Sequence, residues 1–252
     1  MLKDYNRTIR LDIQYDGTNY SGWQRQPKHP SIQSVLEDAI SVIANEKVTL
    51  FASGRTDAGV HARQQLVSFS TRHAKAPLRA FMEGTNTLLP PDIRVLRAIE
   101  EKIEFHAISS AKSKIYRYFF VQSPIEQVFL RNYVWQIRFP LNISKMKRSI
   151  PDLIGKHDFT CFQTHGQETK TSIRTIHRAS IKKTYEKIHY LELEADGFLR
   201  HMVRSIMGTL VDIGTGKMEP KSLKKIIQSK SRAKAGQTAP AHGLFLWEVI
   251  TK

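Results

Sequence analysis

A loop near residue 55 carries an arginine and an aspartate between two glycines. It follows a short apolar stretch and reads Ala52-Ser53-Gly54-Arg55-Thr56-Asp57-Ala58-Gly59-Val60-His61-Ala62. Glycines permit sharp turns and the close approach of a ligand. A carboxylate near a guanidinium is favoured in its ionised form, which can act as a nucleophile or a base. The alternative is that Asp57 is a turn residue bonded to its own backbone, with Arg55 on the surface.

Several other chemistries lack the residues that they need. The single cysteine, Cys161, excludes an intrachain disulfide and a cysteine-rich metal site. There is no phosphate-binding P-loop, because Gly216-Lys217 lacks the upstream glycine and the following serine or threonine. The histidines lack the spacing that a zinc deaminase needs. A metal-dependent nuclease would need a cluster of acids around Asp57, but the nearest acid before it is Glu46. The sequence therefore predicts chemistry by ordinary side chains, with no metal and no cofactor.

The charge of the chain indicates a polyanionic partner. Its 252 residues include 39 Lys and Arg against 23 Asp and Glu, a net charge of +16 and a pI of about 10.0. Neutralising phosphates with release of counterions drives binding by such proteins. The alternative is that the excess charge only keeps the protein in solution. The sequence has no apolar run long enough for a transmembrane helix, and its N-terminus lacks a signal-peptide pattern. We therefore expect a cytoplasmic protein without a membrane span.

The periodicity of the sequence predicts an α+β protein. We expect strands over residues 8–15, 48–52, 65–70, 93–99, 115–121, 176–183, 188–195 and 244–250, and helices over 32–44, 77–86, 144–154, 199–211 and 221–229. Both halves mix hairpin-like strands with helices. This pattern indicates two similar subdomains of mainly antiparallel sheet with packed helices, divided as residues 1–107 and 108–252.

The loop motif and several others resemble the TruA family of tRNA pseudouridine synthases. Besides GRTDAGVHA, the matching motifs in family order are YDGT, SGWQRQ, SIQ, FHA, KIYRY, GKHDF, FLRHMVR and APAHGL, spread over about residues 8 to 249. The resemblance implies the pseudouridine synthase fold with an RNA cleft between the subdomains. It also implies tRNA as the partner and a homodimer.

The implied activity is the isomerisation of uridine to pseudouridine at tRNA positions 38, 39 and 40 of the anticodon stem-loop. By resemblance Asp57 is the catalytic aspartate. It would attack the sugar C1′, add to the base, or act as a base at C2′, and the sequence leaves these three routes open. The competing hypothesis is a non-catalytic RNA-binding protein on the same scaffold.

Three further residues gain a role from the resemblance. Tyr116 matches the tyrosine that stacks on the target base, whereas Tyr118 is assigned to the core. Arg55 is expected to pair with Asp57 in the free enzyme or to occupy the space that the extruded uridine leaves, and the alternative is a solvated charge on the loop. Arg204 is directed towards the active-site carboxylate, and for Arg200 we prefer a phosphate contact or simple exposure.

Other positions are less decided. Ile108 stands where the family usually has an arginine, which removes one candidate phosphate contact. Trp23 is equally suited to stacking on RNA and to the core. A basic run is a solvated face or a track for the tRNA backbone, and it consists of Lys221, Lys224, Lys225, Lys230, Arg232 and Lys234.

Overall fold

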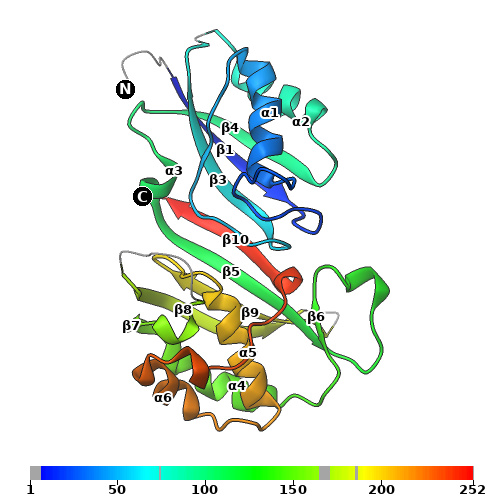
Figure 1. The fold of residues 1–252 in the computed structure, drawn as a ribbon, viewed down its shortest axis with the longest axis vertical. Helices are drawn as coiled ribbons and strands as arrows, with labels where there is room; N and C mark the ends of the chain where they lie inside the picture. Colours follow the sequence, from blue (N-terminus) through cyan, green and yellow to red (C-terminus); the bar gives the residue numbers. More distant parts are fainter. Residues whose placement is uncertain (1–6, 74, 165–170, 185–186, 252) are drawn as a thin grey trace. The chain divides into compact units, whose positions relative to one another are not determined.

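The computed structural model describes residues 7–73, 75–164, 171–184 and 187–251, which form two compact units. Unit 1 comprises the residues up to Lys112 and those from Leu246 onward, and unit 2 comprises Ser113–Phe245. Figure 1 draws unit 1 mainly in blue and cyan and unit 2 mainly in green to orange.

Unit 1 is built on an antiparallel sheet. The strand β1 (Arg7–Tyr15) pairs with β4 (Ile93–Glu101) on one side and with β3 (His61–Thr71) on the other. The short β2 (Phe51–Ala52) and the final strand β10 (Leu244–Thr251) both pair with β3. Because β10 lies beside β3, the end of the chain belongs to unit 1, whereas the division expected from the sequence placed it in the second subdomain.

Helices cover one face of this sheet. Figure 1 shows α1 (Ile32–Ala44) and α2 (Thr85–Leu88) on the same face, and a π-helical turn, Ala80–Gly84, leads into α2. The alternating apolar residues of β1 and the inner residues of α1 are fully buried and form the core of unit 1. They are Ile9, Leu11, Ile13, Ile32, Leu36 and Ile40. A further short helix, α3 (Ala107–Ser110), precedes β5.

The predicted bounds of α1 are confirmed, whereas the strand expected over residues 48–52 is too long. The hydroxyl of Ser31 accepts from the Ser34 backbone N–H at 3.2 Å and the Ser34 hydroxyl accepts from the Ser31 N–H at 3.2 Å, which begins the helix at Ile32. Only two residues form β2, because the Leu50 N–H donates to the buried Glu37 carboxylate at 2.9 Å instead of to a strand.

Unit 2 is also built on antiparallel strands. Its strand order is β5 (Ala111–Gln122), β9 (His189–Ala195), β8 (Ile173–Lys183) and β7 (Gly155–Asp158). The predicted pairing of the segments now seen as β8 and β9 is confirmed. A short strand that the sequence did not indicate, β6 (Trp135–Ile137), runs parallel to the end of β5.

The described part of unit 2 contains three α-helices (Figure 1). They are α4 (Ile143–Ser149), α5 (Met202–Gly214) and α6 (Ser222–Ser229), of which α4 and α5 pack against each other. The helix expected over 144–154 becomes a 3-10 turn from Ile150, because Pro151 has no N–H to continue the α-helical ladder. The helix expected from residue 199 begins only at Met202, because His201 is left-handed with φ of 62°.

The expected fold class is therefore confirmed: each unit sets helices against a mainly antiparallel sheet. None of the helices in the described ranges is both long enough and apolar enough to span a membrane.

Candidate active site

The loop from Ser53 to Val60 joins β2 to β3 in unit 1, and its first two residues are held from β3. The Ser53 N–H donates to the Leu66 carbonyl at 2.8 Å, and the Ser53 hydroxyl donates to Gln65 Oε1 at 2.7 Å. The same Gln65 side chain donates from Nε2 to the Gly54 carbonyl at 2.7 Å. One buried amide therefore fixes two consecutive loop residues.

The middle of the loop is held at Thr56. Its hydroxyl lies 2.8 Å from the Tyr15 hydroxyl, and its carbonyl accepts from the Trp23 N–H at 3.0 Å. Burial raises the pKa of Tyr15 to about 12, and the hydrogen bonds with Thr56 and Gln65 only partly oppose it. Tyr15 therefore remains a neutral phenol at physiological pH. Trp23 is itself buried, which places it in the core of unit 1 and not at an RNA-stacking surface.

The end of the loop is fixed by close backbone contacts. The Val60 N–H donates to the Asp57 carbonyl at 3.1 Å, and the Gly59 N–H donates to the Tyr20 carbonyl at 3.4 Å. The buried His61 accepts from the Gly17 N–H at Nδ1 over 3.1 Å. A Cβ at Gly17 would lie 2.1 Å from the Val60 carbonyl oxygen, so only glycine fits there.

These contacts leave Asp57 half-buried and Arg55 exposed, on either side of the buried Thr56. The backbone around the carboxylate is thus defined while the carboxylate retains access to solvent. A carboxylate in this position can act as a nucleophile or as a base. The structure places Arg55 and Asp57 on one loop, and their predicted ion pair stays a prediction.

Tyr116 and Arg204 lie in unit 2. Tyr116 is on β5, only 7% exposed, and its ring meets that of Phe198 edge to face at 4.9 Å between centroids. Two residues along, Tyr118 lies in the core as predicted, and its hydroxyl donates to the Pro240 carbonyl at 2.7 Å. Every residue of α5 except Arg204 is buried, so Arg204 is the one side chain that this helix presents outward.

Arg204 is bonded to the segment 239–243 near the C-terminus. Its Nε donates to the Ala239 carbonyl at 2.7 Å, and the Ala239 N–H donates back to the Arg204 carbonyl at 3.1 Å. The next carbonyl, that of Pro240, receives Tyr118. This segment therefore holds both α5 and β5, a role that its sequence motif did not reveal.

Some of the other candidate residues are exposed, whereas others are bonded to neighbouring residues of the protein. Ile108 is 58% exposed on α3. The basic run is partly structural, since Lys230 pairs with Asp158 at 3.0 Å and Arg232 donates to the Gly236 carbonyl at 2.8 Å. Lys224 and Lys225 are exposed on α6. No cluster of three or more metal-ligating side chains occurs within the described part of the chain.

Sequence reasoning missed the residues beneath the loop. Gln65 and Tyr15 are polar residues on buried strand positions, which is the signal that marks them as bonded to something specific. Neither the alternation pattern nor the loop motif says which group they bond.

Comparisons with known proteins identify the family. A sequence model described as tRNA pseudouridine synthase matches residues 13–108 and 150–251. The chain is 44% identical to tRNA pseudouridine synthase A of Pelobacter propionicus, over 96% of this chain and 99% of that protein. It is 42% identical to the protein of that name from a Thermoanaerobacter species, over 97% of this chain and 99% of the other. For the protein of that name from Moorella thermoacetica the identity is also 42%, over 96% of this chain and 98% of the other.

The chain belongs to the tRNA pseudouridine synthase family, as its motifs predicted. It is an RNA-modifying isomerase with tRNA as its substrate.

Proposed function

We propose that this protein converts uridine to pseudouridine at positions 38, 39 and 40 of the tRNA anticodon stem-loop, with Asp57 as the catalytic carboxylate. The observation that carries the proposal is the half-buried Asp57 on a loop whose neighbouring residues are bonded to buried groups. Such a loop presents a carboxylate in one defined position, which a catalytic group needs.

The reaction requires no group from outside the substrate. The bond between uracil N1 and ribose C1′ breaks, a bond between C5 and C1′ forms, and the proton on C5 is replaced by one on N1. An ionised Asp57 serves each of the three routes, as a nucleophile at C1′, as a nucleophile at the base, or as a base at C2′. Every route needs the target nucleotide out of its stack and beside the carboxylate.

The remaining site residues have supporting roles in this proposal. Tyr116 stacks on the target base, a contact worth about 1–3 kcal/mol for an aromatic ring. The family resemblance assigns Arg204 to the active-site carboxylate, and its Nε is bonded to the Ala239 carbonyl. Arg55, exposed on the loop, pairs with Asp57 in the free enzyme or fills the space that the extruded uridine vacates. The net charge of +16 supports binding to the tRNA phosphates. We place the protein in the cytoplasm, because its tRNA substrate is found there.

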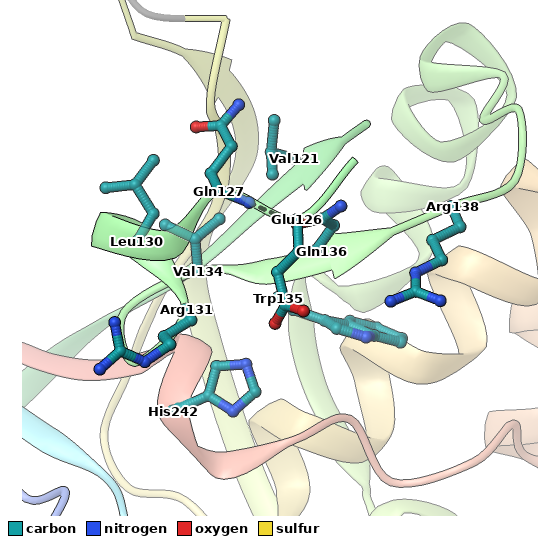
Figure 2. A pocket seen from close by; sticks show the side chains of 10 residues that line it. All are labelled: Val121, Glu126, Gln127, Leu130, Arg131, Val134, Trp135, Gln136, Arg138 and His242. Carbon is teal, nitrogen blue, oxygen red and sulfur yellow. Dashed lines mark hydrogen bonds between the residues drawn. The ribbon is translucent and has the colours of Figure 1, made fainter. Parts of the chain in front are cut away.

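A homodimer is the second part of the proposal. Between β5 and α4, unit 2 exposes several large apolar side chains, with Phe129 92% exposed. They include Ile125, Val128, Phe129 and Phe139. Beside them is a pocket in which Val121, Leu130 and Val134 gather on one side (Figure 2). Glu126, Arg131 and Arg138 also line it, so the surface carries both signs of charge. A twofold interface uses the same patch on both subunits, and exposed apolar surface of this kind is typical of interaction sites.

The dimer is tested by mass in solution. Light scattering should give twice the 28.9 kDa chain mass for the wild type and a single chain for Phe129→Asp. Leu88→Asp, at an exposed apolar residue of unit 1, is the control and should stay dimeric. A monomeric wild type at assay concentration would contradict the dimer.

The activity is tested by tritium release from tRNA labelled at uridine C5. Wild type should release tritium from positions 38 to 40, and Asp57→Asn should release none while still binding tRNA, because the substitution removes only the ionisable carboxylate. Asp38→Asn, at an exposed aspartate of α1, is the matched control and should keep full activity. Binding without release by the wild type would instead favour the non-catalytic RNA-binding protein.

A further inference from the structure

A buried polar network lies directly beneath the loop that carries Asp57. Gln65 on β3 is completely buried, and its amide accepts from the Ser53 hydroxyl at 2.7 Å and donates to the Gly54 carbonyl at 2.7 Å. The Gln65 side chain also acts on the Tyr15 hydroxyl, because it lowers the pKa of Tyr15 against the larger effect of burial. Gln65 therefore links the start of the loop to the end of β1.

Tyr15 extends this network to the residue that precedes Asp57. Its buried hydroxyl lies 2.8 Å from the Thr56 hydroxyl. The Thr56 carbonyl is bonded from another direction by the Trp23 N–H at 3.0 Å. With its side chain and its carbonyl both bonded, Thr56 has little rotational freedom. The backbone direction at Asp57 is therefore set one residue upstream.

Stability alone does not explain these polar groups. A buried polar side chain costs free energy unless it is bonded, and a well-packed apolar residue stabilises a core at least as well. Apart from the Leu66 N–H, which donates to Gln65 Oε1 at 3.1 Å, the hydrogen bonds of these two side chains run to the loop residues Ser53, Gly54 and Thr56. A network of this kind specifies one conformation of the segment that it contacts.

We propose that Gln65 and Tyr15 are positioning residues for the isomerisation, which hold residues 53–56 so that the Asp57 carboxylate meets the target nucleotide in a reactive geometry. The proposal rests on the proposed role of Asp57. A displacement of about 1 Å in a reacting group can lower a rate by about 100-fold, so loss of the network should appear in the chemical step and not in tRNA binding.

The first test uses Gln65→Met and Tyr15→Phe, which keep the volume of the side chain and remove its hydrogen bonds. Single-turnover rates at saturating tRNA should fall by about 10- to 100-fold for Gln65→Met and by about 3- to 10-fold for Tyr15→Phe. The tRNA dissociation constant should stay within about twofold of the wild-type value, because neither residue reaches the surface.

Two control variants separate positioning from stability. Thr71→Val removes a buried hydroxyl at the far end of β3, where it donates to Glu46 at 2.6 Å. Tyr20→Phe removes a tyrosine hydroxyl that donates to Asp92 at 2.6 Å, and it keeps the backbone carbonyl that accepts from the Gly59 N–H. Both should lower the melting temperature as much as the test variants do, yet keep the wild-type rate when assayed well below that temperature. Rates that follow melting temperature across all four variants would overturn the proposal.

A third comparison tests the hydrogen bond itself. Thr56→Ser keeps the hydroxyl that meets Tyr15 and should be near wild type, whereas Thr56→Val should match Tyr15→Phe. Because both lose the same bond, the double variant Tyr15→Phe/Thr56→Val should be slowed by less than the product of the two single effects. Multiplicative effects would overturn the proposal.

The variant Asp57→Asn is assayed beside these. If Asp57→Asn is inactive and Gln65→Met has the wild-type rate, the positioning proposal is wrong and the proposed function stands. If Asp57→Asn is fully active, the proposed function fails and the positioning proposal fails with it.

Discussion

The proposed site residues of the two units are held in different ways. Asp57 and Arg55 lie on a loop, and buried side chains with two close glycine contacts define its backbone. Tyr116 and Arg204 lie on a strand and a helix, whose repeating backbone already sets the direction of their side chains. A loop has no such repeat, so its conformation depends on each individual contact. Small substitutions near the loop should therefore be more damaging than similar ones in unit 2.

The largest effect is expected for Gly22→Ala. Gly22 has φ of 91°, and a Cβ there would lie 2.7 Å from the Thr56 carbonyl oxygen and 3.0 Å from the Asp57 carbonyl carbon. Relief of this clash must move the backbone of the proposed catalytic residue. The single-turnover rate should fall by at least about 100-fold, measured by tritium release at saturating tRNA.

Gly216→Ala is the matched control in unit 2. Gly216 also has positive φ, 85°, but a Cβ there meets nothing within 4 Å. The variant should lose only the roughly 1–2 kcal/mol of left-handed strain and keep its turnover. Equal losses of activity in the two glycine variants would contradict the difference between the units.

The sequence predicted local features of the fold better than long-range ones. The helix from Ile32 to Ala44 follows from its apolar spacing and from the Ser31 cap, both of which act within a few residues. The strand at 48–52 was overestimated because a carboxylate from α1 takes the Leu50 N–H. The start of α5 was misplaced because His201 adopts a left-handed conformation that few non-glycine residues adopt.

The same limit applies to the candidate site. The motif around Asp57 pointed to the loop and to a family, which the comparisons confirm. It did not predict that Gln65, eleven residues beyond Gly54 and on β3, would hold that loop. A buried glutamine indicates a specific partner, but only the paired strands determine which carbonyl lies within its reach.

Arg204→Lys tests how unit 2 holds its site. Lysine keeps the positive charge but lacks the Nε that donates to the Ala239 carbonyl at 2.7 Å. The catalytic rate should fall by roughly 10-fold, the size of one hydrogen bond to a charged group, with tRNA binding unchanged. Arg200→Lys, at an exposed arginine just before α5, is the control and should behave as wild type. A larger change in binding than in rate would make Arg204 a phosphate contact.

A smaller effect is expected for Asp158→Asn, which removes a polar anchor of unit 2. Asp158 accepts from the Thr160 hydroxyl at 2.6 Å and from Lys230 at 3.0 Å. Desolvation alone would raise the pKa of Asp158, but hydrogen bonds from Thr160, Ser172 and Lys230 outweigh it and lower that pKa. The variant should lose about 1–2 kcal/mol of unfolding free energy at pH 7, with turnover unchanged.

The pH dependence of that loss follows from the direction of the shift. A lowered folded-state pKa stabilises the protein above the unfolded pKa of about 3.9, and the contribution disappears as the pH falls through the folded value. Urea unfolding should therefore show the full difference between wild type and Asp158→Asn at pH 7 and a shrinking one below about pH 4. Glu219→Gln, at an exposed acid of unit 2, should show no such difference. A constant difference across this range would mean that packing, and not charge, carries the effect.

The smallest effect is expected for Ile108→Arg, which restores the arginine of the family pattern on an exposed position of α3. If this surface contacts tRNA, the new charge meets a phosphate, and affinity should rise roughly two- to fivefold, the strength of an exposed ion pair. The slope of log affinity against log salt should steepen by about 0.7 to 0.9. Leu88→Arg adds the same charge at another exposed apolar residue of unit 1 and separates local contact from net charge. If both variants gain the same affinity for tRNA, the gain comes from the net charge of the protein, which is already +16. In that case α3 makes no specific contact with tRNA.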